Sequence, residues 1–200
     1  MVEGATLVTV LRHGAVAGAP FVYRGRQDDP LSEAGWRQME AAVGTEAYDV
    51  IATSPLRRCQ EFSEKLARRN GLSLQLLPAF QEIDFGEWEG LTPDQAAAPH
   101  PDLHHRFRAG NGAAPGGESL TDLHHRVRRV WETWLADSTG GRRLLVTHAG
   151  VMRALLMDLL DLPASSIYRI ALPEAAGFQV SILAGEAPVL LNLNPAAMRD

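Results

Sequence analysis

The chain has 200 residues, 46% of them hydrophobic, with a formal net charge of −5 and a pI near 5.8. This length and composition predict one domain, residues 1–200, with a sizeable core, and they exclude extended disorder. The negative net charge argues against nucleic-acid binding through a broad basic surface. The sequence shows no signal-peptide pattern and no apolar run of ~18 residues, which favours a cytoplasmic protein with no membrane partner.

Apolar strands alternate with amphipathic helices along most of the chain. Strands are predicted at 7–11, 48–54, 72–78 and 142–148, helices at 31–43, 54–71, 119–135 and 150–162, and a hairpin with Gly185 in its turn at 178–194. Such alternation is typical of an α/β fold, and we expect three α/β/α layers around a mainly parallel sheet.

Two of the predicted helices carry recognisable end signals. In the first helix, Ser32 is the expected N-cap. In the second, Ser54 is the expected N-cap, Pro55 the first helical residue, and Asn70 with Gly71 the stop. Residues 91–117, rich in Pro, Gly, Ala and His, are instead expected to form a small, irregular, cap-like insertion with short helical pieces.

Residues suited to chemistry follow two of the predicted strands. The first strand ends at Arg12 and His13, and the fourth ends at His148. In an open α/β sheet, ligands bind beyond the carboxyl ends of the strands. The two histidines are therefore expected to face one another at one edge of the sheet.

The second predicted helix adds two cations, Arg57 and Arg58, in its first turn. Cations at a helix N-terminus are mildly unfavourable unless an anion binds there. At ~100° per residue, Arg58 lies closer than Arg57 to the apolar stripe of this helix. That stripe consists of Leu56, Cys59, Phe62 and Leu66. We therefore assign Arg58 to the site and Arg57 to its rim.

Two arginines and two histidines together suit a phosphate group. Arginine forks match phosphate oxygens, and a neutral imidazole can attack phosphorus as a nucleophile. The second histidine, protonated or as an N–H donor, can stabilise charge on the equatorial oxygens. Glu82, which follows the 72–78 strand, is the preferred proton donor for the leaving alcohol, with Asp84 and Glu87 as alternatives.

Five stretches of the chain carry a family resemblance. They are "LRHG" at 11–14, "TSPLRRCQEF" at 53–62, "EIDFGEWEG" at 82–90, "GGESLTDLHHRV" at 116–127 and "VTHAGVMRALL" at 146–156. In order and spacing they resemble the histidine phosphatase superfamily, with its phosphoglycerate mutase-like fold. The resemblance implies that His13 forms a phosphohistidine and that Arg12, Arg58 and His148 bind the phosphoryl group. It also implies that Glu82 is the acid and base.

Within that superfamily the chain is most similar to the α-ribazole phosphatase branch, through "YRGRQDDPLSEAGW" at 23–36 and the short stretch after Glu82. This implies a metal-independent phosphomonoesterase acting on a small phosphate ester, with α-ribazole 5′-phosphate of cobalamin biosynthesis as one candidate. Ala15 and Ala19 replace polar residues that mutases carry, which argues against a phosphoglycerate mutase-type isomerase. A non-catalytic module that binds a phosphorylated ligand is a further alternative. Such a module would be expected to lack His13 or Glu82, and both are present.

The mouth of the site is expected to consist of Arg24, Gly25 and Arg26 together with the 91–117 segment. The substrate's leaving group would be selected there, because loop shape sets this choice.

A metal site is not expected, although five other histidines suggest one at first sight. These are His100, His104, His105, His124 and His125. No acid or cysteine completes a ligand set around them with clear geometry. The single cysteine, Cys59, excludes a disulfide framework and a CxxC motif, and its apolar helix position predicts a core residue. We expect neither a metal nor any other cofactor.

Overall fold

The computed structural model describes residues 4–136 and 141–193, which form a six-stranded sheet with the strand order β3-β2-β4-β1-β5-β6. The strands are β1 (Thr6–Arg12), β2 (Val50–Thr53), β3 (Leu74–Leu76), β4 (Gly141–Thr147), β5 (Gly177–Ile182) and β6 (Val189–Leu193). The first four strands pair in parallel with one another, whereas β5 pairs antiparallel with both β1 and β6. The predicted, mainly parallel sheet is confirmed, as is the hairpin after residue 177.

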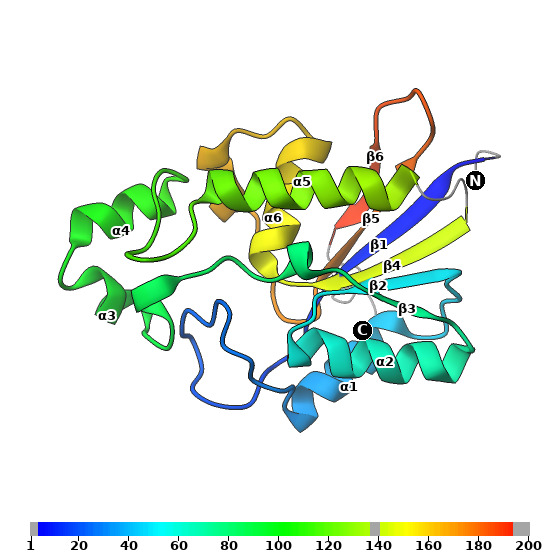
Figure 1. Ribbon diagram of the computed structural model, residues 1–200, viewed down its shortest axis with the longest axis horizontal. Helices are drawn as coiled ribbons and strands as arrows, with labels where there is room; N and C mark the ends of the chain where they lie inside the picture. The colour runs from blue at the N-terminus through cyan, green and yellow to red at the C-terminus, as the bar shows by residue number, and fades with distance from the viewer. Residues whose placement is uncertain (1–3, 137–140, 194–200) are drawn as a thin grey trace.

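Helices cover both faces of the sheet (Figure 1). One layer contains α1 (Glu33–Val43) and α2 (Arg57–Asn70), and the other contains α5 (Leu120–Ala136) and α6 (Ala149–Leu159). The predicted three-layer α/β/α fold is therefore confirmed. Strand alternation divides the core between the two faces: Val10 and Leu145 pack in the α5–α6 layer, and Leu11 and Val146 in the α1–α2 layer.

The central pair of strands brings distant parts of the chain to one edge. β1 and β4 lie side by side and in parallel, with Arg12 opposite Thr147. The backbone N–H of His13 donates to Thr147 O at 2.9 Å, so the strand pairing continues one residue further. The residues that follow both strands consequently emerge together at the carboxyl edge of the sheet.

Two of the four predicted helix-end signals are confirmed. Ser32 caps α1 by accepting the Gly35 N–H at 3.1 Å, and Gly71 ends α2 in the left-handed conformation with φ 66°. The prediction for the start of α2 is wrong: the helix begins at Arg57 with Leu56 as N-cap. The hydroxyl of Ser54 instead accepts the Leu56 N–H at 3.3 Å and bonds to a histidine of the site described below.

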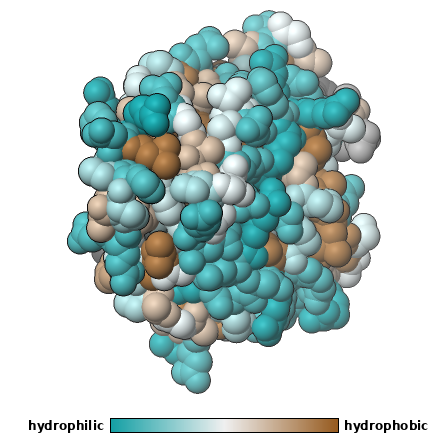
Figure 2. Space-filling model, turned by 60° about the vertical axis from the view of Figure 1, so that its left-hand side comes forward, coloured by the Kyte–Doolittle hydropathy of each residue, from teal (hydrophilic) through white to brown (hydrophobic). Residues whose placement is uncertain are grey.

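The 91–117 segment contains two short helices, α3 (Pro93–Ala97) and α4 (Pro101–Arg108). They project beyond the end of the sheet at which the parallel strands finish (Figure 1). This end of the molecule is mostly hydrophilic, with apolar patches that are small and separated (Figure 2). Three 3-10 helices, Pro78–Phe80, Gly86–Trp88 and Ala164–Arg169 (η3), complete the described elements, and η3 lies in a region with no predicted structure. Of the described helices, none has the length and apolar character needed to cross a bilayer.

Two glycines allow the loop after β1 to lie directly against α1. A Cβ atom on Gly35 would lie 1.9 Å from Ala15 O, and one on Gly14 would lie 2.4 Å from Gly35 O. Since backbone atoms are on both sides of this contact, no side-chain rotation can relieve a clash. The close approach holds the residue that follows His13 in place.

We predict that Gly35→Ala destabilises the fold, although alanine is normally the better helix former. Overpacking at the Ala15 contact is expected to lower the free energy of unfolding by about 1–3 kcal/mol, measured by urea denaturation. The exposed neighbour Arg37 provides a control, because Arg37→Ala is expected to stay within about 0.5 kcal/mol of the wild type. A Gly35→Ala protein at least as stable as the wild type would contradict the close packing.

Candidate active site

His13 lies at the carboxyl edge of the sheet, in the wall of a cavity of about 650 Å³. Its ring Nδ1 lies 2.8 Å from Gly14 O. A carbonyl oxygen can only accept, so Nδ1 carries the proton and Nε2 keeps its lone pair. Burial, with Arg58 and Arg12 nearby, holds the pKa of His13 well below its usual value. The ring is therefore neutral and nucleophilic at Nε2.

Arg58 is fully buried, with 0% of its surface exposed, at the start of α2. It donates to Gln27 O at 2.5 Å, to Gly25 O at 2.8 Å and from Nε to His148 Nδ1 at 3.3 Å. The neighbouring Arg57 has a side chain that is 51% exposed and pairs with a glutamate on its own helix. The structure thus brings Arg58, and not Arg57, into the cluster.

His148 follows β4, and its ring centroid lies 5.2 Å from that of His13. Because Arg58 is the donor in their contact, Nδ1 of His148 accepts, and the proton resides on Nε2, which donates to Ser54 Oγ at 2.7 Å. Burial and the charge of Arg58 hold the pKa of His148 well below its usual value. The ring is therefore neutral. It is also fully buried and, unlike His13, does not belong to the residues that line the cavity.

Arg12 ends β1 and lines the same cavity. One terminal nitrogen donates to Leu172 O at 2.5 Å. Its Nε is buried and has no hydrogen-bond partner among residues 4–136 and 141–193. An unsatisfied buried donor costs about 1–3 kcal/mol, and more for a charged group, so the site is stabilised when an anion accepts this bond.

Glu82 lines the cavity, whereas the two alternative proton donors, Asp84 and Glu87, do not. Its two oxygens accept the N–H of Gly150 at 3.1 and 3.2 Å, in the first turn of α6, where the helix dipole favours negative charge. A Cβ atom on Gly150 would lie 2.2 Å from Glu82 Oε1, so a side chain at this position would displace the carboxylate from where it now lies. Asp84 instead accepts the Gly86 N–H, and Glu87 is exposed.

Arg126 of α5 positions the turn that carries Glu82, a role that the sequence reasoning missed. It forms an ion pair with Glu118 at 2.6 Å. It also donates to three backbone carbonyls of the turn, those of Ala79, Gln81 and Glu82, at 2.6, 2.9 and 3.1 Å. Both charged residues lie in the stretch 116–127, which carried the resemblance without an assigned role. Their eight-residue separation across the start of a helix is the signal that could have identified the pair.

The predicted mouth residues separate into two groups. Arg24 and Gly25 line the cavity, with Arg24 held by an ion pair to Asp29. Arg26 does not line it, because its side chain points to Asp84, with the ion pair at 3.2 Å. The expectation that Arg26 contributes to the mouth is thus not met in this conformation.

Other walls of the cavity come from segments far apart in the sequence. The cap contributes Phe107 and Arg108, α6 contributes Arg153, and η3 contributes Tyr168. At the mouth lies Phe21, which is 89% exposed and has a φ of 57°, a strained conformation for a residue with a side chain.

Two of the five histidines outside the site bond to side chains that have no part in the cluster around His13. His104 bonds through Nε2 to the hydroxyl of Tyr23 at 2.8 Å, and His124 pairs with Asp158 at 2.7 Å. Within the described ranges, no group of three or more His, Cys, Asp or Glu residues could hold a metal ion. Cys59 is buried in the core as predicted, and burial raises the pKa of its thiol to about 12.

Comparison with known sequences gives one family and several relatives. The sequence model of the histidine phosphatase superfamily (branch 1) matches residues 8–195. A bifunctional protein of Mycobacterium tuberculosis is 35% identical over 177 residues, covering 86% of this chain but 49% of the relative, so the chain spans about half its length. A probable phosphoglycerate mutase of Yersinia pestis is 30% identical over 171 residues, covering 82% of this chain and 80% of the relative.

Solved structures show the same architecture. A mycobacterial glucosyl-3-phosphoglycerate phosphatase superposes with a TM-score of 0.84 at 28% identity, covering 95% of this chain and 99% of its own. A putative α-ribazole-5′-P phosphatase of Escherichia coli superposes with a TM-score of 0.80 at 20% identity, covering 96% of this chain and 97% of its own. The second likeness concerns the fold alone.

The lowered pKa values of both buried histidines predict how stability depends on pH. The unfolded chain binds protons near pH 6.5 and the folded chain does not, so stability falls as the pH drops below 6.5. Between pH 6.5 and 5.5 each histidine is expected to remove about 1 kcal/mol from the free energy of unfolding, measured by urea denaturation.

NMR spectra of the histidine rings provide the specific readout for this prediction. The ring C–H signals of His13 and His148 should keep neutral shifts down to pH 5.5. The ring signals of exposed His105, in the same spectra, provide the comparison outside the site. Titration of His13 or His148 near pH 6.5 would show that the site does not depress their pKa values.

Proposed function

Because the chain belongs to the histidine phosphatase superfamily, branch 1, we propose that it is a metal-independent phosphomonoesterase that works through a phosphohistidine on a small phosphorylated metabolite. One observation carries this proposal. A neutral, buried His13, with its free lone pair on Nε2, shares a cavity with Arg12, Arg58 and Glu82. A nucleophile, phosphate-binding cations and a proton donor are the groups that this reaction needs.

In the first half-reaction, Nε2 of His13 attacks phosphorus in line with the ester oxygen. The P–N bond forms as the P–O bond to the leaving group breaks, and protonated Glu82 transfers its proton to the departing oxygen. Arg12 and Arg58 bind the non-bridging oxygens, whose charge they stabilise throughout the step. The unpartnered Nε of Arg12 supports this role, since a phosphate oxygen would be its acceptor.

In the second half-reaction, water attacks the phosphohistidine. Glu82, now ionised, takes a proton from the water as the new P–O bond forms and the P–N bond breaks. Inorganic phosphate leaves, His13 returns to its neutral form, and Glu82 is again protonated. Every charge in both steps is met by a side chain of this chain, so we expect turnover to continue in the presence of EDTA.

We assign His148 to the phosphoryl group as well, acting as an N–H donor because its ring is neutral. Its proton is engaged with Ser54 and its Nδ1 with Arg58. A phosphate that draws Arg58 towards itself would free Nδ1. Donation to the phosphoryl group then requires the ring proton to move from Nε2 to Nδ1, with Nε2 accepting the Ser54 hydroxyl proton as a hydrogen bond in exchange. His148 also fixes the orientation of the Arg58 guanidinium before substrate binds.

For the substrate, we propose a small phosphate ester, with α-ribazole 5′-phosphate as one candidate. The candidate is supported by the sequence similarity of residues 23–36 to that branch of the superfamily. A second candidate function is a phosphoglycerate mutase-type isomerase, favoured by the 30% identity to a probable mutase. Conversion of 3- to 2-phosphoglycerate without release of phosphate would identify the isomerase, and release of phosphate from a panel of esters would identify the phosphatase.

Replacement of the two adjacent arginines tests the phosphate-binding assignment. Arg58→Ala removes a preorganised donor to the transition state and is expected to lower kcat about 10²–10³-fold on p-nitrophenyl phosphate. Arg57→Ala, which removes an exposed side chain, is expected to stay near the wild type. Thermal unfolding of each variant confirms that the fold persists. A larger defect in Arg57→Ala would overturn the assignment.

Separate substitutions at His13 and Glu82 distinguish the nucleophile from the acid. His13→Ala should form no phosphoenzyme from any substrate. Glu82→Gln should be severely slowed on an alkyl phosphate but should still phosphorylate His13 from p-nitrophenyl phosphate, because a good leaving group needs little protonation. Mass spectrometry after acid-free quenching detects the added phosphate on the His13 peptide.

Two results of this experiment would contradict the roles. One is phosphate on His148 in place of His13. The other is a Glu82→Gln defect that is equally large on both substrates, which would mean that Glu82 does not protonate the leaving group.

A further inference from the structure

Two arginines outside the phosphate cluster share one aromatic ring in the wall of the same cavity. Arg108 lies at the end of α4 and Arg153 in α6, and both flank Tyr168 of η3. Their guanidinium carbons lie 4.5 and 5.3 Å from the centroid of the ring. Both distances are within the range of cation–π contacts, so the ring favours positions of half-buried Arg153 and exposed Arg108 on either side of it.

These two cations lack a paired anion. Neither Arg108 nor Arg153 forms an ion pair within residues 4–136 and 141–193, and the Nε of Arg153 donates to a backbone carbonyl, Ile167 O, at 3.2 Å. Burial raises the pKa of Tyr168 to about 12, so its hydroxyl is uncharged at neutral pH. The ring therefore contributes a quadrupole and a hydrogen-bonding group, but no negative charge.

Glu82 offsets part of this charge only when it is ionised. Burial lowers the pKa of Arg153, and the Glu82 carboxylate opposes that shift. In the proposed first half-reaction Glu82 must be protonated, so its charge is absent when substrate is bound. The other carboxylate that lines the cavity, Glu174, acts on Arg12 and not on Arg153. Protonation of Glu82 therefore leaves Arg153 and Arg108 without the carboxylate that offsets the charge of Arg153.

We propose that Arg108 and Arg153 form a second anion subsite, and that the substrate is a phosphomonoester whose leaving group carries a carboxylate or a second phosphate. The inference rests on the proposed function, because it concerns the leaving-group side of the same cavity. Guanidinium forks bind either anion through paired hydrogen bonds. The leaving group of α-ribazole 5′-phosphate carries no such anion, so the subsite favours phosphorylated acids and bisphosphates over that candidate.

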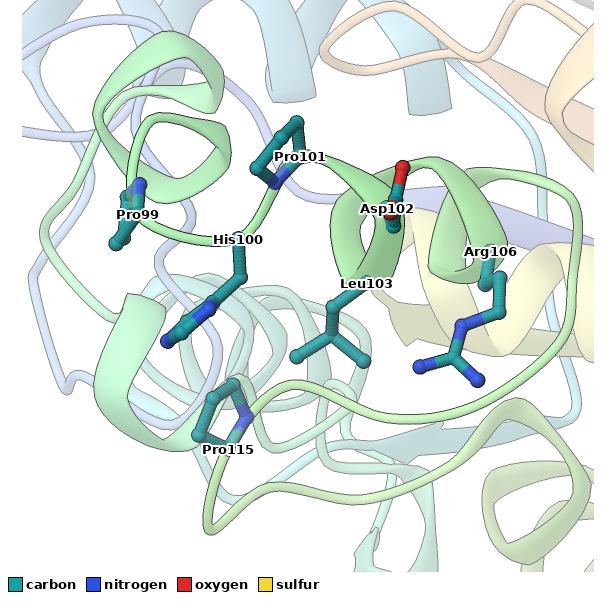
Figure 3. Close-up of a pocket in the computed structure, with 7 residues that line it drawn as sticks. All are labelled: Pro99, His100, Pro101, Asp102, Leu103, Arg106 and Pro115. Carbon is teal, nitrogen blue, oxygen red and sulfur yellow. The ribbon is translucent and has the colours of Figure 1, made fainter.

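Arg106 provides a matched control on the same helix. It lies two residues from Arg108, and residues two apart on a helix do not share a face. Its side chain lines a separate surface depression of about 530 Å³ and extends towards the loop that contains Pro115, with Leu103 between it and His100 (Figure 3). Arg106→Met therefore removes a charge from α4 without changing the cavity that contains His13.

The experiment compares pairs of substrates that differ in the second anion. O-phospho-L-serine and phosphoethanolamine differ by a carboxylate, and fructose 1,6-bisphosphate and fructose 6-phosphate differ by a phosphate. The quantity measured is the ratio of kcat/KM within each pair, for the wild-type chain and for Arg108→Met, Arg153→Met and Arg106→Met. p-Nitrophenyl phosphate serves as a reference ester for turnover itself.

We expect the wild type to prefer the member with the second anion by about ten-fold or more in at least one pair. Arg108→Met and Arg153→Met should each reduce that ratio about ten-fold, towards one, which is the loss expected for a hydrogen-bonded charged contact. Arg106→Met should keep the wild-type ratio. The pair that shows the preference identifies the second anion as a carboxylate or a phosphate.

A wild-type ratio near one in both pairs would overturn the subsite while leaving the phosphatase proposal intact. The subsite is equally overturned if Arg153→Met slows both members of a pair alike, because Arg153 would then act through Glu82. Absence of phosphate release from every ester, the reference included, would overturn the proposed function and the subsite with it.

Discussion

The site depends on one fully buried guanidinium. Arg58 connects the first turn of α2 to the loop carbonyls of Gly25 and Gln27 and to the ring of His148. Burying a cation without a paired carboxylate costs several kcal/mol, which these acceptors offset only in part. Burial, together with the charge of Arg58, holds the pKa values of His13 and His148 well below the usual value, so both rings are neutral. A phosphate dianion bound beside Arg58 would relieve the desolvation that the folded chain otherwise tolerates.

The acid at the other side of the cavity is positioned by a separate network. Gly150 at the start of α6 holds the carboxylate of Glu82 from one direction, and Arg126 of α5 holds its backbone from another. Neither of these residues needs to touch a substrate. They show how the layer formed by α5 and α6 fixes the proton donor, while α2 fixes Arg58 and β1 fixes Arg12, so that the two networks meet at the carboxyl edge of the sheet.

Local signals in the sequence predicted the framework and much of the cluster. The apolar strands, the Ser32 cap and the direction of Arg58 all depend on neighbouring residues along the chain, and the sequence contains those neighbours. Features that depend on contacts between distant parts of the chain were not predicted. Ser54 looked like a helix cap, but its hydroxyl contacts His148, which is 94 residues away. The convergence of Arg108 and Arg153 on one ring likewise depends on η3, whose sequence shows no clear periodicity.

The place of β1 in the sheet also determines when during synthesis this arrangement can arise. The first strand of the chain is a central one, and its partners are β4, with Thr6 opposite Gly141, and β5, with Thr6 opposite Ile182. During synthesis on the ribosome, β1 therefore emerges long before β4 and β5 and stays unpaired until they follow. Loop closure over such a separation is slow, and unpaired apolar strands attract chaperones and other nascent chains. His13 and His148 thus first meet late in translation, and a prematurely terminated chain carries the first histidine without the second.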